Sequence, residues 1–191
     1  MYIAIEGIDT AGKSTQIQAL KNIYPHAVIT KEPGGTAIGQ EIRSLVLSAK
    51  TQSKKAEFLL FLADRAEHIK EVIEPNLDKM IISDRSAVSG VAYALTQEEI
   101  SQTAIVHLNR FATNGIYPQK VFLLKLTKEE LEYRLSQKEL DGIELRGSAY
   151  LLGIQDAIIQ AAKLLEIELI EIDATQSIED ITKEILNNIS L

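Results

Sequence analysis

The 191-residue chain contains no cysteine and no tryptophan, and it has only four prolines. Without cysteine it has neither a disulfide framework nor a thiolate metal site. No apolar run approaches the length of about 18 residues that a membrane-spanning helix needs. The first residues also lack the basic and apolar regions of a signal peptide. We therefore predict a cytoplasmic protein with no membrane partner.

Positive charge is also in deficit, because 20 Lys and Arg stand against 27 Asp and Glu and the net charge is -7. Proteins that bind nucleic acid in bulk usually carry a basic surface, so we expect no nucleic-acid partner. A few basic residues that converge locally can still bind a phosphate. The length and the 46% of hydrophobic residues suit one domain over residues 1–191.

Five short apolar runs alternate with longer amphipathic segments. The runs cover residues 2–5, 27–30, 80–83, 121–126 and 168–172, and they are rich in the Ile, Val and Leu typical of strands buried on both faces. Helices are expected over residues 13–23, 39–49, 54–77, 86–94, 97–112, 128–138, 148–165 and 177–189. This alternation predicts a three-layer α/β fold with a five-stranded parallel sheet covered by helices on both faces.

The residues after the first predicted strand match the phosphate-binding loop pattern G-x-x-x-x-G-K-[ST], reading GIDTAGKS over 7–14. The loop opens onto a predicted helix, and strand, loop, helix is the context in which this pattern works. Its backbone N–H groups point at phosphate oxygens, and the helix N-terminus adds a favourable field. We expect Lys13 to reach the β- and γ-phosphates of a nucleoside triphosphate and Ser14 to hold Mg²⁺.

A second candidate site follows the third apolar run, where Asp84 and Arg85 end the segment. Ligands of open α/β sheets bind at this carboxyl edge of the strands. Asp84 is placed to support Mg²⁺, and Arg85 is placed to clamp a phosphate with two hydrogen bonds. Taken alone, the two residues are equally consistent with a surface ion pair, but the nearby phosphate loop favours the functional interpretation.

Phe61 and Arg65 are four residues apart on one predicted helix and therefore share a face. Such a face can hold a flat heterocycle, with the ring stacked on Phe61 and hydrogen-bonded by Arg65. Spacing alone favours the simpler alternative of a core phenylalanine beside a solvated arginine. Residues 137–147 form a polar, charged segment with two glycines, which can be a lid but is more often a plain surface loop.

Taken in order, these segments resemble the thymidylate kinase family. The resemblance rests on EGIDTAGKST over 6–15, KEPGGT over 31–36, LFLADRAEH over 60–68 and SDRS over 83–86, with further likeness over 109–115 and 172–174. It implies a P-loop kinase that uses Mg²⁺, transfers the γ-phosphoryl group of ATP to thymidine monophosphate (dTMP) and forms a homodimer.

The resemblance also implies individual roles. Asp9 would contact the deoxyribose 3′-hydroxyl, Phe61 would stack on thymine, and Arg65 would bond its O4. Arg43 and Arg85 would hold the monophosphate, while Tyr93 would lie under the sugar. The residues implied to bind ATP are Gly7, Ile8, Asp9, Thr10, Ala11, Gly12, Lys13, Ser14 and Thr15. Those implied to bind dTMP are Asp9, Glu32, Pro33, Arg43, Phe61, Arg65, Arg85, Ser89 and Tyr93. The predicted catalytic residues are Lys13, Asp84, Arg85, Arg134 and Lys138, and the predicted metal ligands are Ser14 and Asp84.

The chain departs from the family pattern at four positions. Thr10 stands where relatives carry Gly or Arg, and Gly142 stands where the lid commonly carries Arg. Charge for the transition state must then come from Lys13, Arg85 and some of Arg134, Lys138 and Arg146. Gly90 and Ala94 occupy positions that contact the thymine edge in some bacterial members, so base recognition here leans on Phe61 and Arg65.

Two alternatives stay open. Another nucleoside monophosphate kinase, of the UMP/CMP type, would prefer CMP as acceptor, whereas an Arg65 that donates to O4 cannot bond a cytosine amino group. A P-loop nucleotide switch would hydrolyse GTP without phosphorylating an acceptor, although the Asn-Lys-x-Asp guanine-binding pattern is absent from the sequence. The predicted dimer interface lies on the 54–77 helix, where Phe58, Leu59 and Leu62 form an apolar surplus.

Overall fold

The computed structural model describes residues 1–48, 51–97, 99–137, 139 and 144–189. Within them a five-stranded parallel sheet forms in the order β2-β3-β1-β4-β5. The strands are β1 Tyr2–Glu6, β2 Val28–Lys31, β3 Ile81–Asp84, β4 Lys120–Lys125 and β5 Glu168–Asp173. The predicted sheet is confirmed, and each strand lies within two residues of its predicted bounds. The order reverses at β1, so the loops after β1 and β3 meet at one edge.

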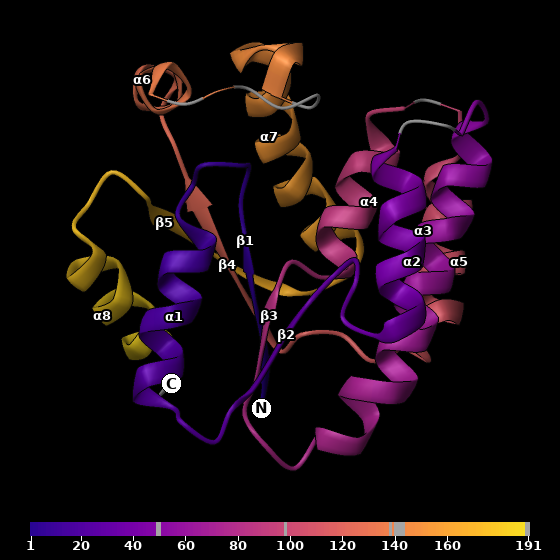
Figure 1. Cartoon of the computed structure of the whole chain (residues 1–191), viewed down its shortest axis with the longest axis horizontal. Helices are drawn as coiled ribbons and strands as arrows, with labels where there is room; N and C mark the ends of the chain where they lie inside the picture. Colours follow the sequence, from indigo (N-terminus) through magenta and orange to yellow (C-terminus); the bar gives the residue numbers. More distant parts are fainter. Residues whose placement is uncertain (49–50, 98, 138, 140–143, 190–191) are drawn as a thin grey trace.

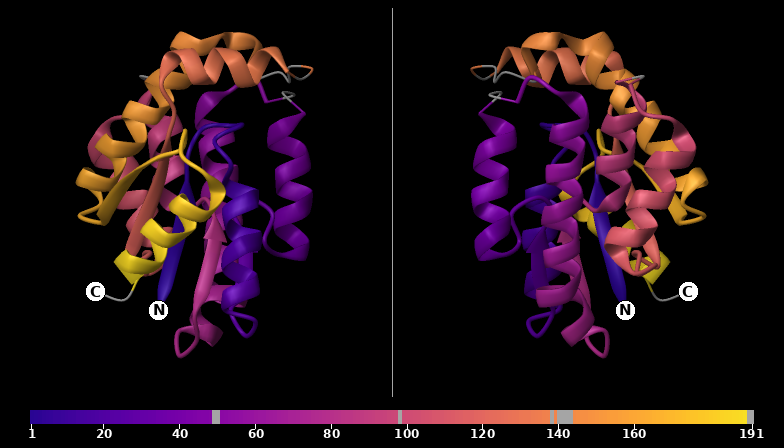
Figure 2. Two further views of the ribbon diagram at one scale, coloured as in Figure 1. Left: turned by 90° about the vertical axis from the view of Figure 1, so that its left-hand side faces the viewer. Right: turned by 90° about the vertical axis from the view of Figure 1, so that its right-hand side faces the viewer.

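The helices form layers on both sides of this sheet, as predicted (Figure 1). α1 Lys13–Ile23 and α8 Ile178–Ile189 lie together on one side. The other side carries α2 Ala37–Leu47, α3 Lys54–His68, α4 Ala87–Leu95, α5 Gln102–Thr113 and α7 Ser148–Leu164. α6 Lys128–Ser136, the short 3₁₀ turn η3 Glu144–Arg146 and the start of α7 lie beyond the carboxyl edge of the sheet (Figure 2). No helix among the described residues is long and apolar enough to span a membrane.

Burial follows the position of each strand in the sheet. Every residue of the central strand β1 is buried, and so are the four middle residues of β4. The edge strands differ, because β2 is only half-buried and β5 exposes Glu168 and Glu171. The prediction of strands buried on both faces is therefore wrong for the two edges, where one neighbour and part of the helical cover are missing.

Two predicted helices differ by more than two residues from their bounds in the structure. The α-helical part of residues 54–77 ends at His68, and the chain continues as a π-helical turn over Ile69–Ile73 and a 3₁₀ turn over Glu74–Asn76. Pro75 has no N–H to donate to the preceding turn, which is incompatible with an α-helix interior. The helix predicted over 97–112 begins at Gln102, because Ser101 caps it with a hydrogen bond from the Ala104 N–H.

Removing that cap gives a simple test of this boundary. Replacing Ser101 with alanine should lower the free energy of unfolding by about 1 kcal/mol, because one orphan N–H at the helix start loses its acceptor. Urea denaturation measures this change. Ser101→Gly should cost only a few tenths of a kcal/mol, and an unchanged free energy of unfolding in Ser101→Ala would mean that the cap contributes nothing.

The apolar surplus predicted on α3 is smaller than expected. Phe58 and Leu62 belong to the hydrophobic core of the chain itself, and only Leu59 is exposed, at 55%. The interpretation of Phe58 and Leu62 as interface residues is therefore wrong. α3 packs against α4 and α5, and both side chains belong to the main hydrophobic cluster of the chain.

Candidate active site

The phosphate loop joins β1 to α1 through a backbone that most side chains resist. Gly12 has φ 96°, and Thr10 adopts the left-handed region with φ 68° despite its branched side chain. A Cβ at Gly7 would lie 3.0 Å from the Leu124 carbonyl oxygen and 3.1 Å from the Ala11 Cβ. The loop therefore needs glycine at both ends of its turn. Strain of this kind is concentrated at functional sites.

Lys13 lies folded against its own loop. Its Nζ donates to the Ile8 carbonyl at 3.0 Å and lies 3.8 Å from the Asp9 carboxylate. Burial, with the neighbouring positive charge of Arg85 as the next contribution, lowers the pKa of Lys13 to about 8, although Asp9 and Asp84 oppose the shift. The ammonium group is thus poorly solvated and ready to bind anionic phosphates.

This lowered pKa predicts an alkaline loss of nucleotide binding. As the pH rises through about 8, Lys13 in the free protein loses its proton, and kcat/KM for ATP should fall accordingly. Bound phosphates favour the charged ammonium, so kcat at saturating ATP should fall only at higher pH. The pH dependence of kcat/KM for ATP and of kcat at saturating ATP checks both expectations, with circular dichroism at each pH to confirm folding. A kcat/KM for ATP that stays level up to pH 10 would contradict this role of Lys13.

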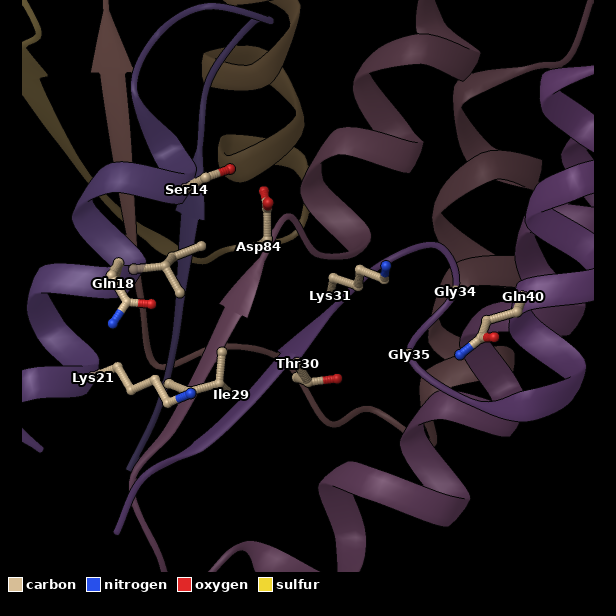
Figure 3. Close-up of a pocket in the computed structure, with 11 residues that line it drawn as sticks. Ser14, Gln18, Lys21, Ile29, Thr30, Lys31, Gly34, Gly35, Gln40 and Asp84 are labelled. Atoms are coloured by element: carbon tan, nitrogen blue, oxygen red, sulfur yellow. The ribbon is translucent and has the colours of Figure 1, made fainter. Parts of the chain in front are cut away.

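Asp84 and Ser14 form a pair of oxygen donors at the mouth of the loop. Asp84 ends β3, and its Oδ1 is buried with no hydrogen-bond partner among the described residues. In Figure 3 the side chains of Ser14 and Asp84 point toward each other. They share a cavity of about 390 Å³ whose lining also includes Lys21 and Lys31. A carboxylate oxygen without a partner beside a free hydroxyl fits the oxygen ligands that Mg²⁺ prefers.

Arg85 connects this edge of the sheet to the phosphate loop. It adopts φ 67°, and its Nη1 donates to the Gly7 carbonyl at 3.0 Å and to Ser89 Oγ at 3.1 Å. Its Nη2 donates to Asp9 at 2.8 Å. The structure thus brings together the predicted phosphate clamp and the predicted sugar contact, which are 76 residues apart in the sequence.

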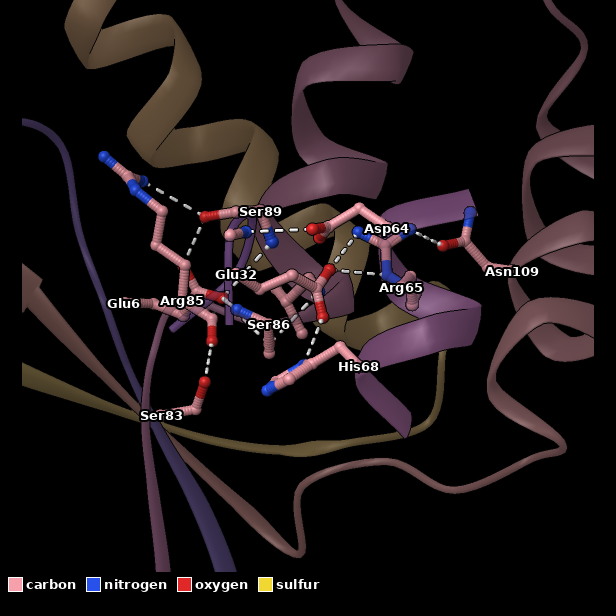
Figure 4. Close-up of polar contacts among 12 residues, drawn as sticks. Glu6, Glu32, Asp64, Arg65, His68, Ser83, Arg85, Ser86, Ser89 and Asn109 are labelled. Atoms are coloured by element: carbon pink, nitrogen blue, oxygen red, sulfur yellow. Dashed lines mark hydrogen bonds and ion pairs between the residues drawn. The ribbon is translucent and has the colours of Figure 1, made fainter. Parts of the chain in front are cut away.

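Glu6 supports Arg85 from beneath, and sequence reasoning gave it no role. Its carboxylate is fully buried and accepts hydrogen bonds from the N–H and hydroxyl of both Ser86 and Ser89. Burial raises the pKa of Glu6 against the opposing effect of Arg85. Figure 4 shows this carboxylate under the turn that carries Arg85. The sequence does indicate something unusual here, because Glu6 is a charged residue at the end of an otherwise apolar strand.

A second cavity of about 420 Å³ joins the donor and acceptor residues. The loop after β2 supplies Glu32, and α2 supplies Arg43, which donates to the Pro33 carbonyl at 3.0 Å. Ser89 lies behind Arg85, and burial raises the pKa of the nearby Tyr93 to about 12, so its phenol is neutral. The residues that line the cavity are Asp9, Thr10, Gly12, Lys13, Ser14, Thr15, Lys31, Glu32, Arg43, Asp84 and Arg85.

Arg65 is buried, with only 1% of its surface exposed, and the alternative of a solvated arginine is wrong. Its Nε donates to Glu32 at 2.6 Å, its Nη2 forms an ion pair with the same oxygen, and its Nη1 donates to Asn109. Burial alone would raise the pKa of Glu32, but Arg65 and His68 outweigh it and hold that pKa below its ordinary value. Phe61 lies one helical turn earlier on α3 and is half-buried. Asn109 and its part in this network were not predicted.

Arg134 on α6 lies against the phosphate loop. Its guanidinium donates to the carbonyls of Thr10 at 3.0 Å and Ala174 at 2.7 Å, and to Glu130. Arg146 is exposed and lies over the ring of Tyr150 at 5.0 Å. Lys138 and residues 140–143 of the predicted lid lie outside the described residues.

Similarity to known proteins agrees with this geometry. A family model described as thymidylate kinase matches residues 5–185. The chain belongs to the thymidylate kinase family. It is 75% identical over 191 residues to a thymidylate kinase of Sulfurimonas denitrificans, covering 100% of both chains. It is 54% identical to one of Aliarcobacter butzleri, over 97% of this chain and 96% of the other.

A solved structure shows the same fold. The crystal structure of thymidylate kinase from Ehrlichia chaffeensis superposes with a TM-score of 0.74 at 28% identity, covering 100% of this chain and 98% of that one. The predicted P-loop α/β fold and the predicted family are confirmed. Membership makes the chain a nucleoside monophosphate kinase rather than a nucleotide switch.

Proposed function

We propose that the chain transfers the γ-phosphoryl group of ATP to dTMP through the residues that line the shared cavity. The observation that supports this proposal most directly is the contact between the ATP-binding loop and the predicted acceptor clamp. Arg85 donates to both Gly7 and Asp9, so the acceptor clamp is built onto the donor loop. The loop from Gly7 to Thr15 would hold ATP, and Arg43 and Arg85 would hold the acceptor phosphate in the same cavity.

The reaction requires positioning and charge neutralisation more than base catalysis. The acceptor is already a phosphate anion, and such a nucleophile needs little activation. Lys13 and the loop N–H groups would orient the γ-phosphoryl group, while Arg85 would offset the repulsion between two anionic substrates. Asp9 would place the sugar through its 3′-hydroxyl, and Tyr93, Ser89, Glu32 and Pro33 would complete the acceptor site.

We further propose Mg²⁺ as the cofactor, held by Ser14 and Asp84 together with nucleotide phosphates. The unpartnered Oδ1 of Asp84 supports this assignment. When bound, the ion would neutralise the β- and γ-phosphates. Arg134 and Lys138 stay proposed as lid-side catalytic cations. For Arg134 the support is its contact with Thr10, which places a positive charge beside the loop that lacks an arginine of its own.

A coupled assay with ATP and four acceptors tests the proposed reaction. dTMP should give the highest kcat/KM, ahead of dUMP, dCMP and CMP, and ADP formation should depend on Mg²⁺. ADP release without acceptor would instead favour hydrolysis, and preference for CMP would favour the UMP/CMP-type alternative. Tolerance of dUMP is measured in the same experiment.

A homodimer is proposed through a surface that keeps Leu59 from the predicted interface but replaces the buried Phe58 and Leu62 with residues of α2 and α5. Leu45 on α2, Leu59 on α3 and Phe111 on α5 are exposed at 52%, 55% and 83%, and α3 packs against both other helices (Figure 2). Light scattering after gel filtration should give twice the chain mass, and Phe111→Glu should give a monomer. Ile178→Glu, at an exposed apolar position on α8, is the control and should stay dimeric. A single domain over residues 1–191 and a cytoplasmic location stay predictions.

A further inference from the structure

We propose that Gly90 and Asn109 are positioning residues that fix the Arg65 guanidinium and thereby set the preference for a carbonyl at the acceptor base. Neither residue would touch the nucleotide itself. The inference rests on the proposed function and on the role that the family resemblance implies for Arg65, a hydrogen bond to the O4 of thymine. It adds the residues that decide where that guanidinium lies.

The guanidinium of Arg65 has five N–H groups in a rigid plane. Glu32 takes the one on Nε and pairs with Nη2, and Asn109 takes one on Nη1. Among the contacts of the described residues this leaves one N–H on each terminal nitrogen for a ligand. Because a guanidinium only donates, these N–H groups can bond a carbonyl at the base edge but cannot bond an amino group.

Asn109 is itself held in a single orientation. It is fully buried on α5, and its Nδ2 donates to the Ile105 carbonyl at 2.7 Å. That bond turns Oδ1 toward Arg65, where it accepts from Nη1. The amide therefore presents its oxygen acceptor to the guanidinium, and not its NH₂ donor. In Figure 4, Asn109 and Glu32 lie on opposite sides of Arg65.

Gly90 limits the guanidinium on another side. It lies within α4, and a Cβ built there would overlap Arg65 Nη2 and lie 3.1 Å from both Cζ and Nη1. A free arginine would move away from such a methyl group, but this guanidinium is held by Glu32 and Asn109 and is buried. Glycine is unfavourable inside a helix, so its presence here is consistent with the space that Arg65 occupies.

Gly90→Ala is the decisive variant because its methyl group acts directly on the position of the guanidinium. Overlap with a buried side chain lowers stability, and the higher helix propensity of alanine offsets only part of that loss, so the melting temperature should fall. In assays below that temperature, KM for dTMP, and the Kd of dTMP from calorimetry, should rise about tenfold or more as the guanidinium shifts. The ratio of kcat/KM for dTMP over dCMP should fall by a similar factor, and KM for ATP should stay unchanged. Gly153→Ala on α7 is the matched control, because a Cβ there meets nothing within 4 Å.

Asn109→Ala should give the same pattern through loss of the Nη1 acceptor, with Asn22→Ala, at an exposed site on α1, as its control. The inference is overturned if Gly90→Ala keeps the wild-type KM for dTMP and the wild-type dTMP:dCMP ratio. It is also overturned if KM for ATP rises as much as KM for dTMP. The wild type separates the two proposals: wild-type protein that prefers dCMP refutes the proposed function, whereas normal wild type with unaltered variants refutes only the roles of Gly90 and Asn109.

Discussion

Replacing Arg85 with alanine is expected to lower kcat/KM for dTMP by about 100- to 1,000-fold, the loss typical of removing one preorganised donor for developing charge. Arg85 makes three hydrogen bonds across the junction of the donor and acceptor sites, to Gly7, Asp9 and Ser89. Without it, the Asp9 carboxylate would lose its 2.8 Å partner and keep only the Lys13 ammonium, 3.8 Å away, as an ion-pair partner. Both kcat and KM for dTMP should therefore change, which steady-state assays measure directly.

Two further variants show whether geometry or charge causes the loss. Arg85→Lys keeps the positive charge but cannot donate to Asp9 and Ser89 from one planar group, so its activity should lie between those of alanine and wild type. Lys163→Ala removes an exposed cation from α7 and should behave as wild type. If Arg85→Ala retains near-normal kcat/KM, the clamp must be another residue.

Replacing Glu32 with alanine is expected to lower the free energy of unfolding by about 3–5 kcal/mol. The reason is that Arg65 would stay buried with its positive charge uncompensated, and removing one partner of a buried ion pair has this effect. Urea denaturation at pH 7 measures the change. Glu171→Ala, which removes an exposed partner of Lys125, is the control and should cost at most about 1 kcal/mol.

The pH dependence of this loss follows from the lowered pKa of Glu32. The carboxylate stabilises the folded state above its ordinary pKa of 4.5, and this stabilisation is lost as the pH falls through the lower folded pKa. The difference between wild type and Glu32→Ala should therefore shrink at acidic pH. Burial, and after it the negative charge of Glu32, raises the pKa of Asp64 to about 6, so the Asp64 pKa should be lower in Glu32→Ala.

A double variant separates charge from packing. Glu32→Ala combined with Arg65→Met removes both charges and leaves an apolar chain of similar length. It should be more stable than Glu32→Ala alone, because no isolated charge is then buried. If the double variant is less stable than the single one by a further large amount, the loss comes from packing and not from the ion pair.

The sequence predicts most accurately where one local pattern determines the structure. The phosphate loop is such a case, since its glycines and its place between a strand and a helix are all contained in residues 2–23. The alternation of strands and helices likewise predicted the layers. It did not reveal which strands lie at the edges, because the sheet order arises from contacts between distant segments. The two glutamates of β5, which are both exposed, were the one local sign of an edge strand.

Helix ends were harder to predict for a related reason. The apolar periodicity of residues 54–77 continues past His68, yet the hydrogen bonding changes to a π turn and then to a 3₁₀ turn around Pro75. Periodicity reports which side chains face the core, but it does not report which carbonyl each N–H chooses. The start of α5 depends on the Ser101 cap, a single hydrogen bond from the Ala104 N–H that apolar periodicity does not report.

The sequence by itself determined the family, the phosphate loop and the residue types of an acceptor site, because these are written in short segments with fixed spacing. Only the tertiary structure decided how the segments meet. It placed Arg85 on Asp9, turned Glu6 under Ser86 and Ser89, and buried Arg65 between Glu32, Asn109 and Gly90. The orientation of a buried charged group depends on partners tens of residues away along the chain, and no local pattern in the sequence records that pairing.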